Sequence, residues 1–198
     1  MIIYMCDLKF VKDVIVITNR HLVEGDYLTQ ISKVVSLHPH AVILREKDIS
    51  DAEYEALARA VLDICDKAQV PCFIHSRYDI ARRLGCSNIH VSITGLQESG
   101  HEINQFENVS VSCHSLEDVT CAISHGATQI ILGTIYETEC KKGLKGKGAE
   151  FVREICEYTK DNGDIPVYAI GGISPDNIAE VKAAGAHGGC MMSYMMTI

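Results

Sequence analysis

Short runs of β-branched residues alternate with longer amphipathic stretches along most of the chain. The short runs predict eight strands, at residues 14–18, 41–45, 72–74, 89–91, 109–113, 129–132, 167–170 and 188–192. Most of the stretches between them carry apolar residues at three- and four-residue spacing, which is typical of amphipathic helices. Strands that alternate with helices indicate βαβ units and a parallel sheet.

The same pattern, read with capping signals, predicts six helices. Ser50 followed by Glu53 forms a capping-box pattern, and Ser174 followed by Pro175 marks another helix start. The expected helices are 27–37, 50–68, 78–84, 115–126, 149–160 and 174–185. The stretch 92–107 has two glycines and no clear apolar stripe, so we expect a loop there with at most one helical turn.

Eight strands with seven connections predict an α/β fold, a single (βα)8 barrel that occupies residues 1–198 as one domain. The sequence stops just after the eighth strand, so we expect the usual eighth helix to be missing from this chain. A doubly wound open sheet is the structural alternative. An edge left by a missing helix would favour self-association, and a homo-oligomer is therefore an open expectation.

The composition of the chain restricts which kinds of molecule it is expected to bind. The net charge is −8, whereas a nucleic-acid binder usually has a basic domain or stripe. The nine cysteines contain no CxxC pair, and we interpret them as reduced thiols in a cytoplasmic protein. There is no secretory signal pattern and no apolar run near the roughly 20 residues that a membrane helix needs. We therefore expect a small anionic ligand, and neither nucleic acid nor membrane.

In (βα)8 barrels the active site lies at the carboxyl ends of the strands. Gly171 and Gly172 follow the seventh strand and Met192 and Ser193 follow the eighth, the position where such barrels often bind phosphate. The alternative is that the two glycines only form a tight turn.

Charged residues at other strand ends add candidates. Arg45 and Lys47 could clamp a phosphate or diphosphate, or could be a solvated charge cluster. Lys141 lies in a glycine-rich loop that is either a lid over an anion or an ordinary exposed loop. Ser112 and His114 share one face of a strand, where the imidazole could move a proton or could simply cap a helix. His90 lies in mid-strand and is expected to point outward, and no residues have metal-ligand spacing.

Several motifs, taken in order, resemble one family along nearly the whole chain. They are Ile17-Thr18-Asn19-Arg20, Leu44-Arg45-Glu46-Lys47, Ile89-His90-Val91, Ser112-Cys113-His114-Ser115 and Ala169-Ile170-Gly171-Gly172-Ile173. The chain resembles the superfamily of thiamin phosphate synthase and thiazole tautomerase. The segment Glu137 to Leu144 looks closer to the tautomerase branch.

The resemblance implies roles for particular residues. Gly172, Met192 and Ser193, with Gly171 beside them, would hold a thiazole phosphate, which is the expected small-molecule partner. Arg45, Lys47, Ser112 and Lys141 match positions that hold the pyrimidine diphosphate in the synthase, where Mg²⁺ steadies the leaving group. Thr134 and Thr138 lie on the same strand-six loop as Lys141 and are further candidates for ligand binding.

Two departures from the synthase pattern decide between the branches. An Asn-Asp pair after strand three is replaced by His75-Ser76, and Gly-Gln-Glu-Asp after strand four is replaced by Ser92 to Gly95. Both carboxylates expected to bind Mg²⁺ are thus lost. We expect a metal-independent, tautomerase-like isomerase of thiamin biosynthesis that needs no cofactor, although Thr134 stands where that branch commonly has a catalytic His.

His114 is then the first choice for the proton shuttle, and Lys141 and Glu137 are the second choices. The alternatives are a thiamin phosphate synthase that requires Mg²⁺, and a thiazole-phosphate binding or regulatory protein without catalysis. A barrel that acts on an unrelated phosphosugar is a weaker possibility.

Overall fold

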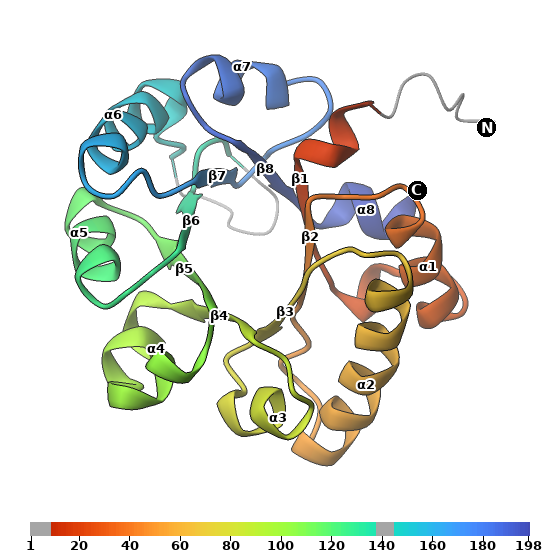
Figure 1. The fold of residues 1–198 in the computed structure, drawn as a ribbon. Coiled ribbons are helices and arrows are strands. Elements are labelled where there is room, and N and C mark those ends of the chain that lie inside the picture. Colours follow the sequence, from red (N-terminus) through yellow and green to blue (C-terminus); the bar gives the residue numbers. More distant parts are fainter. Residues whose placement is uncertain (1–8, 138–144) are drawn as a thin grey trace.

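The computed structural model describes residues 9–137 and 145–198, in which eight parallel strands form a closed barrel in sequence order, β1 to β8. Figure 1 looks along this barrel and shows the helices around it. The strands are β1 (Val14–Ile17), β2 (Ala41–Leu44), β3 (Cys72–His75), β4 (Asn88–Ser92), β5 (Asn108–Cys113), β6 (Gln129–Gly133), β7 (Val167–Ile170) and β8 (Gly188–Met191). The predicted barrel is confirmed, and the open-sheet alternative is excluded because β1 pairs with β8.

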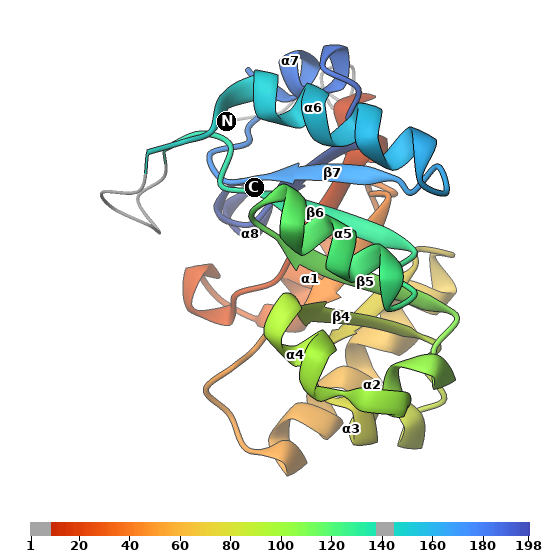
Figure 2. The same cartoon turned by 90° about the vertical axis from the view of Figure 1, so that its left-hand side faces the viewer.

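The α-helices are α1 (Tyr27–Val35), α2 (Asp51–Lys67), α3 (Tyr78–Arg83), α4 (Ile93–Glu98), α5 (Leu116–Ser124), α6 (Gly148–Asp161), α7 (Ile178–Ala183) and α8 (Ser193–Thr197). The described residues also contain three 3₁₀ helices, η2 (Lys9–Asp13), η3 (Arg20–Leu22) and η4 (Gly100–Gln105). Figure 2 shows helices packed along the outside of the strands. Among the described residues there is no helix long and apolar enough to cross a membrane.

Alternate strand residues face two separate cores. In β1, Val14 and Val16 pack in the layer between strands and helices, whereas Ile15 and Ile17 pack inside the barrel. The inner core also contains Phe73 from β3 and Ile131 from β6. Because both faces of a parallel strand are buried, the strands appear in sequence as nearly continuous apolar runs.

Two expectations about short helices were wrong. The stretch 92–107 contains α4 and η4 rather than a loop, and Ser92 caps α4 by accepting from the Gly95 N–H at 3.0 Å. The helix after β7 begins at Ile178, because Ser174 to Asn177 form a turn before it. Each of these two α-helices is only six residues long, so it contains too few apolar residues to show a helical period in the sequence.

The expected absence of an eighth helix was also wrong. Helix α8 is five residues long, and it buries Met195 and Met196. Helix α1 fastens it: Gln30 Nε2 donates to the carbonyl oxygens of Met195 and Ile198, and Lys33 Nζ donates to that of Ile198. The gap that was expected to favour self-association is therefore covered.

Candidate functional site

A pocket of about 560 Å³ lies at the carboxyl end of the barrel. It gathers most of the residues proposed from the sequence, namely Arg45, Lys47, Ser112, His114, Thr134, Gly171, Gly172, Met192 and Ser193. Glu137 is exposed and is not among the residues that line this pocket. The proposed residues Thr138 and Lys141 lie outside the described residues.

The cationic wall of the pocket is held in place by the buried carboxylate of Glu46. Glu46 Oε1 accepts from Thr18 Oγ1 at 2.9 Å and from Tyr27 OH at 3.1 Å, and its carboxylate also accepts from the backbone N–H of Arg20. Thr18 Oγ1 in turn accepts from the backbone N–H of Arg45 at 2.9 Å. This network fixes the end of β2 while Arg45 and Lys47 line the pocket.

Two histidines that sequence analysis had ranked low also line the pocket. His75 ends β3, and His90 lies in the middle of β4. His90 is 4 % exposed and faces the barrel interior, so its expected outward orientation was wrong. The signal was available in the strand alternation, because Ile89 and Val91 pack outward and His90 must face the other way.

Electrostatics keep both imidazoles neutral. Burial, with the charges of Lys47 and Arg45, lowers the pKa of His75 to about 4. Burial, with the neighbouring His75 and Arg45, lowers the pKa of His90 to about 3. Burial and the charge of Arg45 also lower the pKa of Lys47. These shifts share one cause besides burial, an excess of cations that an anionic ligand would relieve.

The glycine loop after β7 packs tightly against the loop after β6. Gly172 has a φ of +64°, and a Cβ added there would lie 2.8 Å from the carbonyl oxygen of Glu137. Gly171 has a φ of +99°, and its added Cβ would lie 2.5 Å from Thr134 Cγ2. Packing alone therefore requires these glycines, a reason that the sequence did not reveal. Within the described part of the chain, the N–H groups of Gly172 and Ile173 have no hydrogen-bond partner in the protein, so both are available to a ligand.

The candidate proton shuttle His114 lies at the pocket rim. Its side chain is 51 % exposed, and Nδ1 lies 3.8 Å from Asp118 Oδ2. The His114 backbone N–H donates to the same carboxylate at 2.7 Å, and Lys147 Nζ donates to the His114 carbonyl. The rim position leaves the imidazole within reach of a ligand in the pocket.

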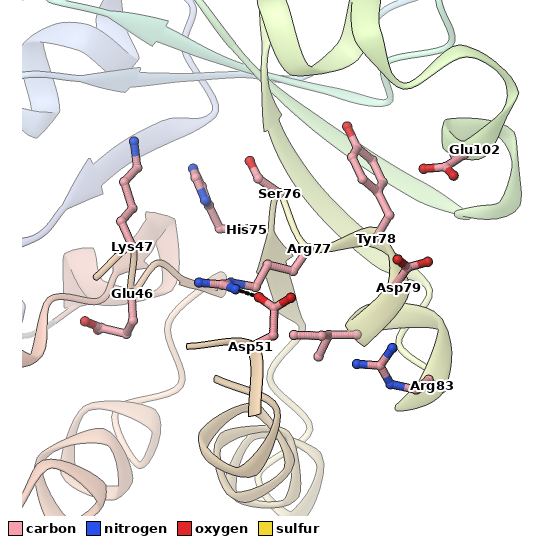
Figure 3. Close-up of a pocket in the computed structure, with 11 residues that line it drawn as sticks. Glu46, Lys47, Asp51, His75, Ser76, Arg77, Tyr78, Asp79, Arg83 and Glu102 are labelled. Carbon is pink, nitrogen blue, oxygen red and sulfur yellow. Dashed lines mark hydrogen bonds and ion pairs between the residues drawn. The ribbon is translucent and has the colours of Figure 1, made fainter. Parts of the chain in front are cut away.

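A second cavity, of about 570 Å³, adjoins the first and shares Lys47 and His75 with it. Figure 3 shows Lys47 and Glu46 pointing in opposite directions, and Arg77 paired with Asp51 at the N-terminus of α2. Arg77 also lies 4.6 Å from the ring centroid of Tyr54. Of the other charged side chains in this lining, Asp79 pairs with Arg82 and Arg83 pairs with Glu55, and neither partner lines the cavity.

The described residues do not offer a metal site. No group of three or more His, Cys, Asp or Glu side chains in the described ranges could hold a metal ion. The described lining of the barrel pocket also contains no Asp or Glu. Ser76 and Gly95 occupy the positions where carboxylates were expected by resemblance, so these residues do not fit a Mg²⁺ ion that requires one or two carboxylates.

Comparison with known proteins supports the assignment by resemblance. The family model described as thiamine monophosphate synthase matches residues 14–195. A thiamine-phosphate synthase of Alkaliphilus oremlandii is 30% identical over 183 residues, covering 91% of this chain and 86% of the relative. That of Clostridium tetani is 28% identical with the same coverage of both chains.

Among solved structures, a thiamine phosphate pyrophosphorylase from Pyrococcus furiosus superimposes with a TM-score of 0.77. It is 22% identical in sequence and covers 96% of this chain and 90% of its own, which shows the shared fold. The family match spans the barrel from β1 into α8. By this match and by its relatives, the chain belongs to the thiamine monophosphate synthase family.

Proposed function

We propose that this protein is an enzyme of thiamine biosynthesis that binds a thiazole phosphate and, beside it, the diphosphate of a pyrimidine substrate. One observation carries the proposal: a pocket whose glycine loop offers free N–H groups at one side and whose other side presents Arg45 and Lys47. The names of the relatives favour the synthase reaction over the tautomerase reaction that we had placed first.

In this proposal each end of the pocket binds one substrate. The N–H groups of Gly172 and Ile173 and the Ser193 hydroxyl donate to the thiazole phosphate. Arg45 and Lys47 neutralise the diphosphate, Arg45 as a fork and Lys47 as a point charge, and Ser112 adds a hydroxyl donor. The roles of Thr138 and Lys141 stay predictions from the resemblance.

Protein cations take the place that carboxylate-bound Mg²⁺ has in the synthase pattern. Because the described lining does not fit the metal, no step of the proposed reaction passes through it. The leaving diphosphate would instead be stabilised by Arg45 and Lys47 in a partly buried pocket, where charge–charge attraction is stronger than in water. Formation of the bond between the two substrates then releases diphosphate at this cationic wall.

A tautomerase is the second candidate, and the same lack of carboxylates favours it. Moving one proton on a thiazole phosphate carboxylate needs a base and no metal. His114 is the candidate base, since Thr134 occupies the position after the β6 glycine and its hydroxyl is a poor base near neutral pH. The glycine loop would bind the phosphate in both reactions.

One set of assays separates the candidates. The purified protein is incubated with thiazole phosphate and pyrimidine diphosphate, with Mg²⁺ or with EDTA, and thiamin phosphate and diphosphate are quantified. Condensation that persists in EDTA supports the synthase proposal with protein cations. NMR of the thiazole tautomer tests the second candidate in parallel. Tight binding without turnover in either assay would indicate a non-catalytic binder.

The phosphate position has its own test, with a matched control on the same helix. Ser193→Asp adds a negative charge at the exposed Ser193 in the pocket lining and should weaken binding of thiazole phosphate at least about 10-fold, since like charges repel. Thr197→Asp adds the same charge to α8 at an exposed residue outside the pocket lining. Equal affinities of the two variants in calorimetry would place the phosphate elsewhere.

A further inference from the structure

The barrel interior is polar on one side. Near β4, β5 and β6 the inward positions include His90, Ser110, Ser112 and Gln129, whereas β1 and β8 contribute apolar side chains such as Ile15 and Cys190. Ser110 is fully buried, and Gln129 is 6 % exposed. Buried polar groups of this kind persist only when hydrogen-bonded, and these four form one continuous chain.

The chain of hydrogen bonds runs from Gln129 to the pocket. Gln129 Nε2 donates to Ser110 Oγ at 3.0 Å, and Ser110 Oγ lies 2.9 Å from His90 Nδ1. His90 Nε2 lies 3.0 Å from Ser112 Oγ, which lines the pocket beside the cations. Each contact has an ordinary hydrogen-bond distance.

Donor and acceptor counting is consistent with one direction for this chain, which the imidazole tautomer tests. The amide nitrogen of Gln129 can only donate to Ser110 Oγ, and we infer that the Ser110 hydroxyl proton is donated in turn to His90 Nδ1, 2.9 Å away. His90 is neutral, because it is buried next to Arg45 and Lys47. A neutral imidazole that accepts at Nδ1 carries its proton on Nε2, and that proton is donated to Ser112 Oγ.

We propose that His90 is a positioning residue that fixes Ser112 as a hydrogen-bond donor toward a phosphate or diphosphate oxygen in the pocket. Because Ser112 Oγ already accepts from His90, its own proton turns toward the pocket. A hydroxyl held in this orientation favours a ligand atom that accepts a hydrogen bond, such as an oxygen of an anion. The inference rests on the proposed anion site and assigns His90 a role that acts through Ser112.

The tautomer can be measured without any ligand. In ¹⁵N- and ¹³C-labelled wild-type protein at pH 7, the His90 ring is expected to give the shifts of a neutral imidazole with hydrogen on Nε2. A ring with hydrogen on Nδ1, or a charged ring, reverses the direction of the chain and overturns the inference. This readout does not depend on whether the proposed reaction occurs.

Binding of inorganic diphosphate by calorimetry tests the consequence for the ligand. Ser112→Ala should weaken binding about 10- to 100-fold, the range for a hydrogen bond to a charged group. His90→Asn keeps a polar group only at the Nδ1 position and should lose as much. His90→Gln places an amide near the Nε2 position and should stay within about threefold of the wild type.

The double variant completes the cycle. His90→Asn combined with Ser112→Ala should bind diphosphate no more weakly than either single variant, because both substitutions remove one oriented donor. Losses that multiply would mean that His90 acts by supporting the fold and would overturn the inference. If the wild type shows the expected tautomer but does not bind diphosphate, the proposed diphosphate site fails and the anionic target of Ser112 fails with it.

Discussion

Arg45, Glu46 and Lys47 are consecutive residues, yet their side chains have opposite surroundings. The two basic residues line the pocket, while Glu46 is 3 % exposed and accepts from Thr18, Arg20 and Tyr27. The alternation of side chains at a strand end explains this separation. A sequence that appears to be a mixed charge cluster thus places positive charge in the pocket lining and negative charge in a buried hydrogen-bond network.

Gly172 gives a prediction at the scale of a single residue. Gly172→Ala should reduce the free energy of unfolding by about 2–4 kcal/mol, since a φ of +64° and a contact of 2.8 Å to backbone both disfavour a Cβ. Gly85→Ala is the matched control: its φ is +67°, and an added Cβ meets nothing within 4 Å, so it should lose about 1 kcal/mol.

Urea denaturation of both variants measures the difference. Equal losses would show that the conformation of Gly172 matters and its close packing against residue 137 does not. The comparison also shows why Gly172→Asp would be a poor probe of a phosphate site: it would damage the loop whether or not a ligand binds there.

At the scale of elements, the N-terminal turn of α2 connects a capped helix start to the strand ends that carry the candidate site. Ser50 and Glu53 form the capping box that the sequence predicts. One residue later, Tyr54 OH donates to the Leu44 carbonyl at 2.6 Å and accepts from the His75 N–H at 3.3 Å. The first turn of α2 therefore ties together the ends of β2 and β3, from which Arg45 and His75 extend.

Ser50→Ala should lower the free energy of unfolding by about 1 kcal/mol, because the first turn loses its side-chain acceptor. Ser50→Asp should stay close to the wild type, since Asp is an equally good N-cap. Thermal unfolding of the three proteins provides the measurement. An alanine variant as stable as the wild type would mean that packing of Tyr54 holds this turn without the cap.

Elements with a continuous apolar run or a long stripe were predictable from the sequence, whereas some of the shortest helices were not. The eight strands and the helix after Ser50 follow from continuous apolar runs or a long stripe. Helices α4 and α8 have six and five residues, too few for a period to emerge, and the predicted helix around α7 began four residues too early. For α8, the stabilising contacts come from Gln30 and Lys33, which are distant in sequence.

The part of the candidate site that lies directly after the strands was predictable from the sequence. Arg45, Lys47 and Ser193 follow directly from the rule that barrels bind ligands at the carboxyl ends of strands. The inward orientation of His90 could have been inferred from the alternation of its strand, but its hydrogen bonds with Ser110 and Ser112 on the neighbouring strand could not. Pairing across strands is not visible in a single stretch of sequence.

At the scale of the whole molecule, neutral histidines inside a cationic barrel predict acid sensitivity. The pKa of His75 falls to about 4 in the folded protein, against about 6.5 in an unfolded chain. Below pH 6.5 the unfolded state therefore binds more protons, and stability, complete above that pH, is lost as the pH falls toward 4. Each such histidine contributes a slope of up to about 1.4 kcal/mol per pH unit.

Urea midpoints between pH 7.5 and 4.5 test this expectation. His75→Asn should reduce the pH dependence of stability, because one proton-binding group is removed from the unfolded state. His38→Asn is the control, at an exposed position with a φ of +53° that asparagine tolerates well. Identical slopes for wild type and His75→Asn would contradict the assigned environment.

The pairing of β1 with β8 has a consequence for how the chain is made. Val14 lies opposite Gly189 and Val16 opposite Met191, so the first strand of the barrel to be synthesised cannot pair on this edge until the last strand has been made. Until then a partly synthesised chain presents two unpaired strand edges, which can recruit other chains. We therefore expect aggregation to threaten this barrel most while it is being synthesised, and factors that shield nascent chains should raise its yield without changing the stability of the folded protein.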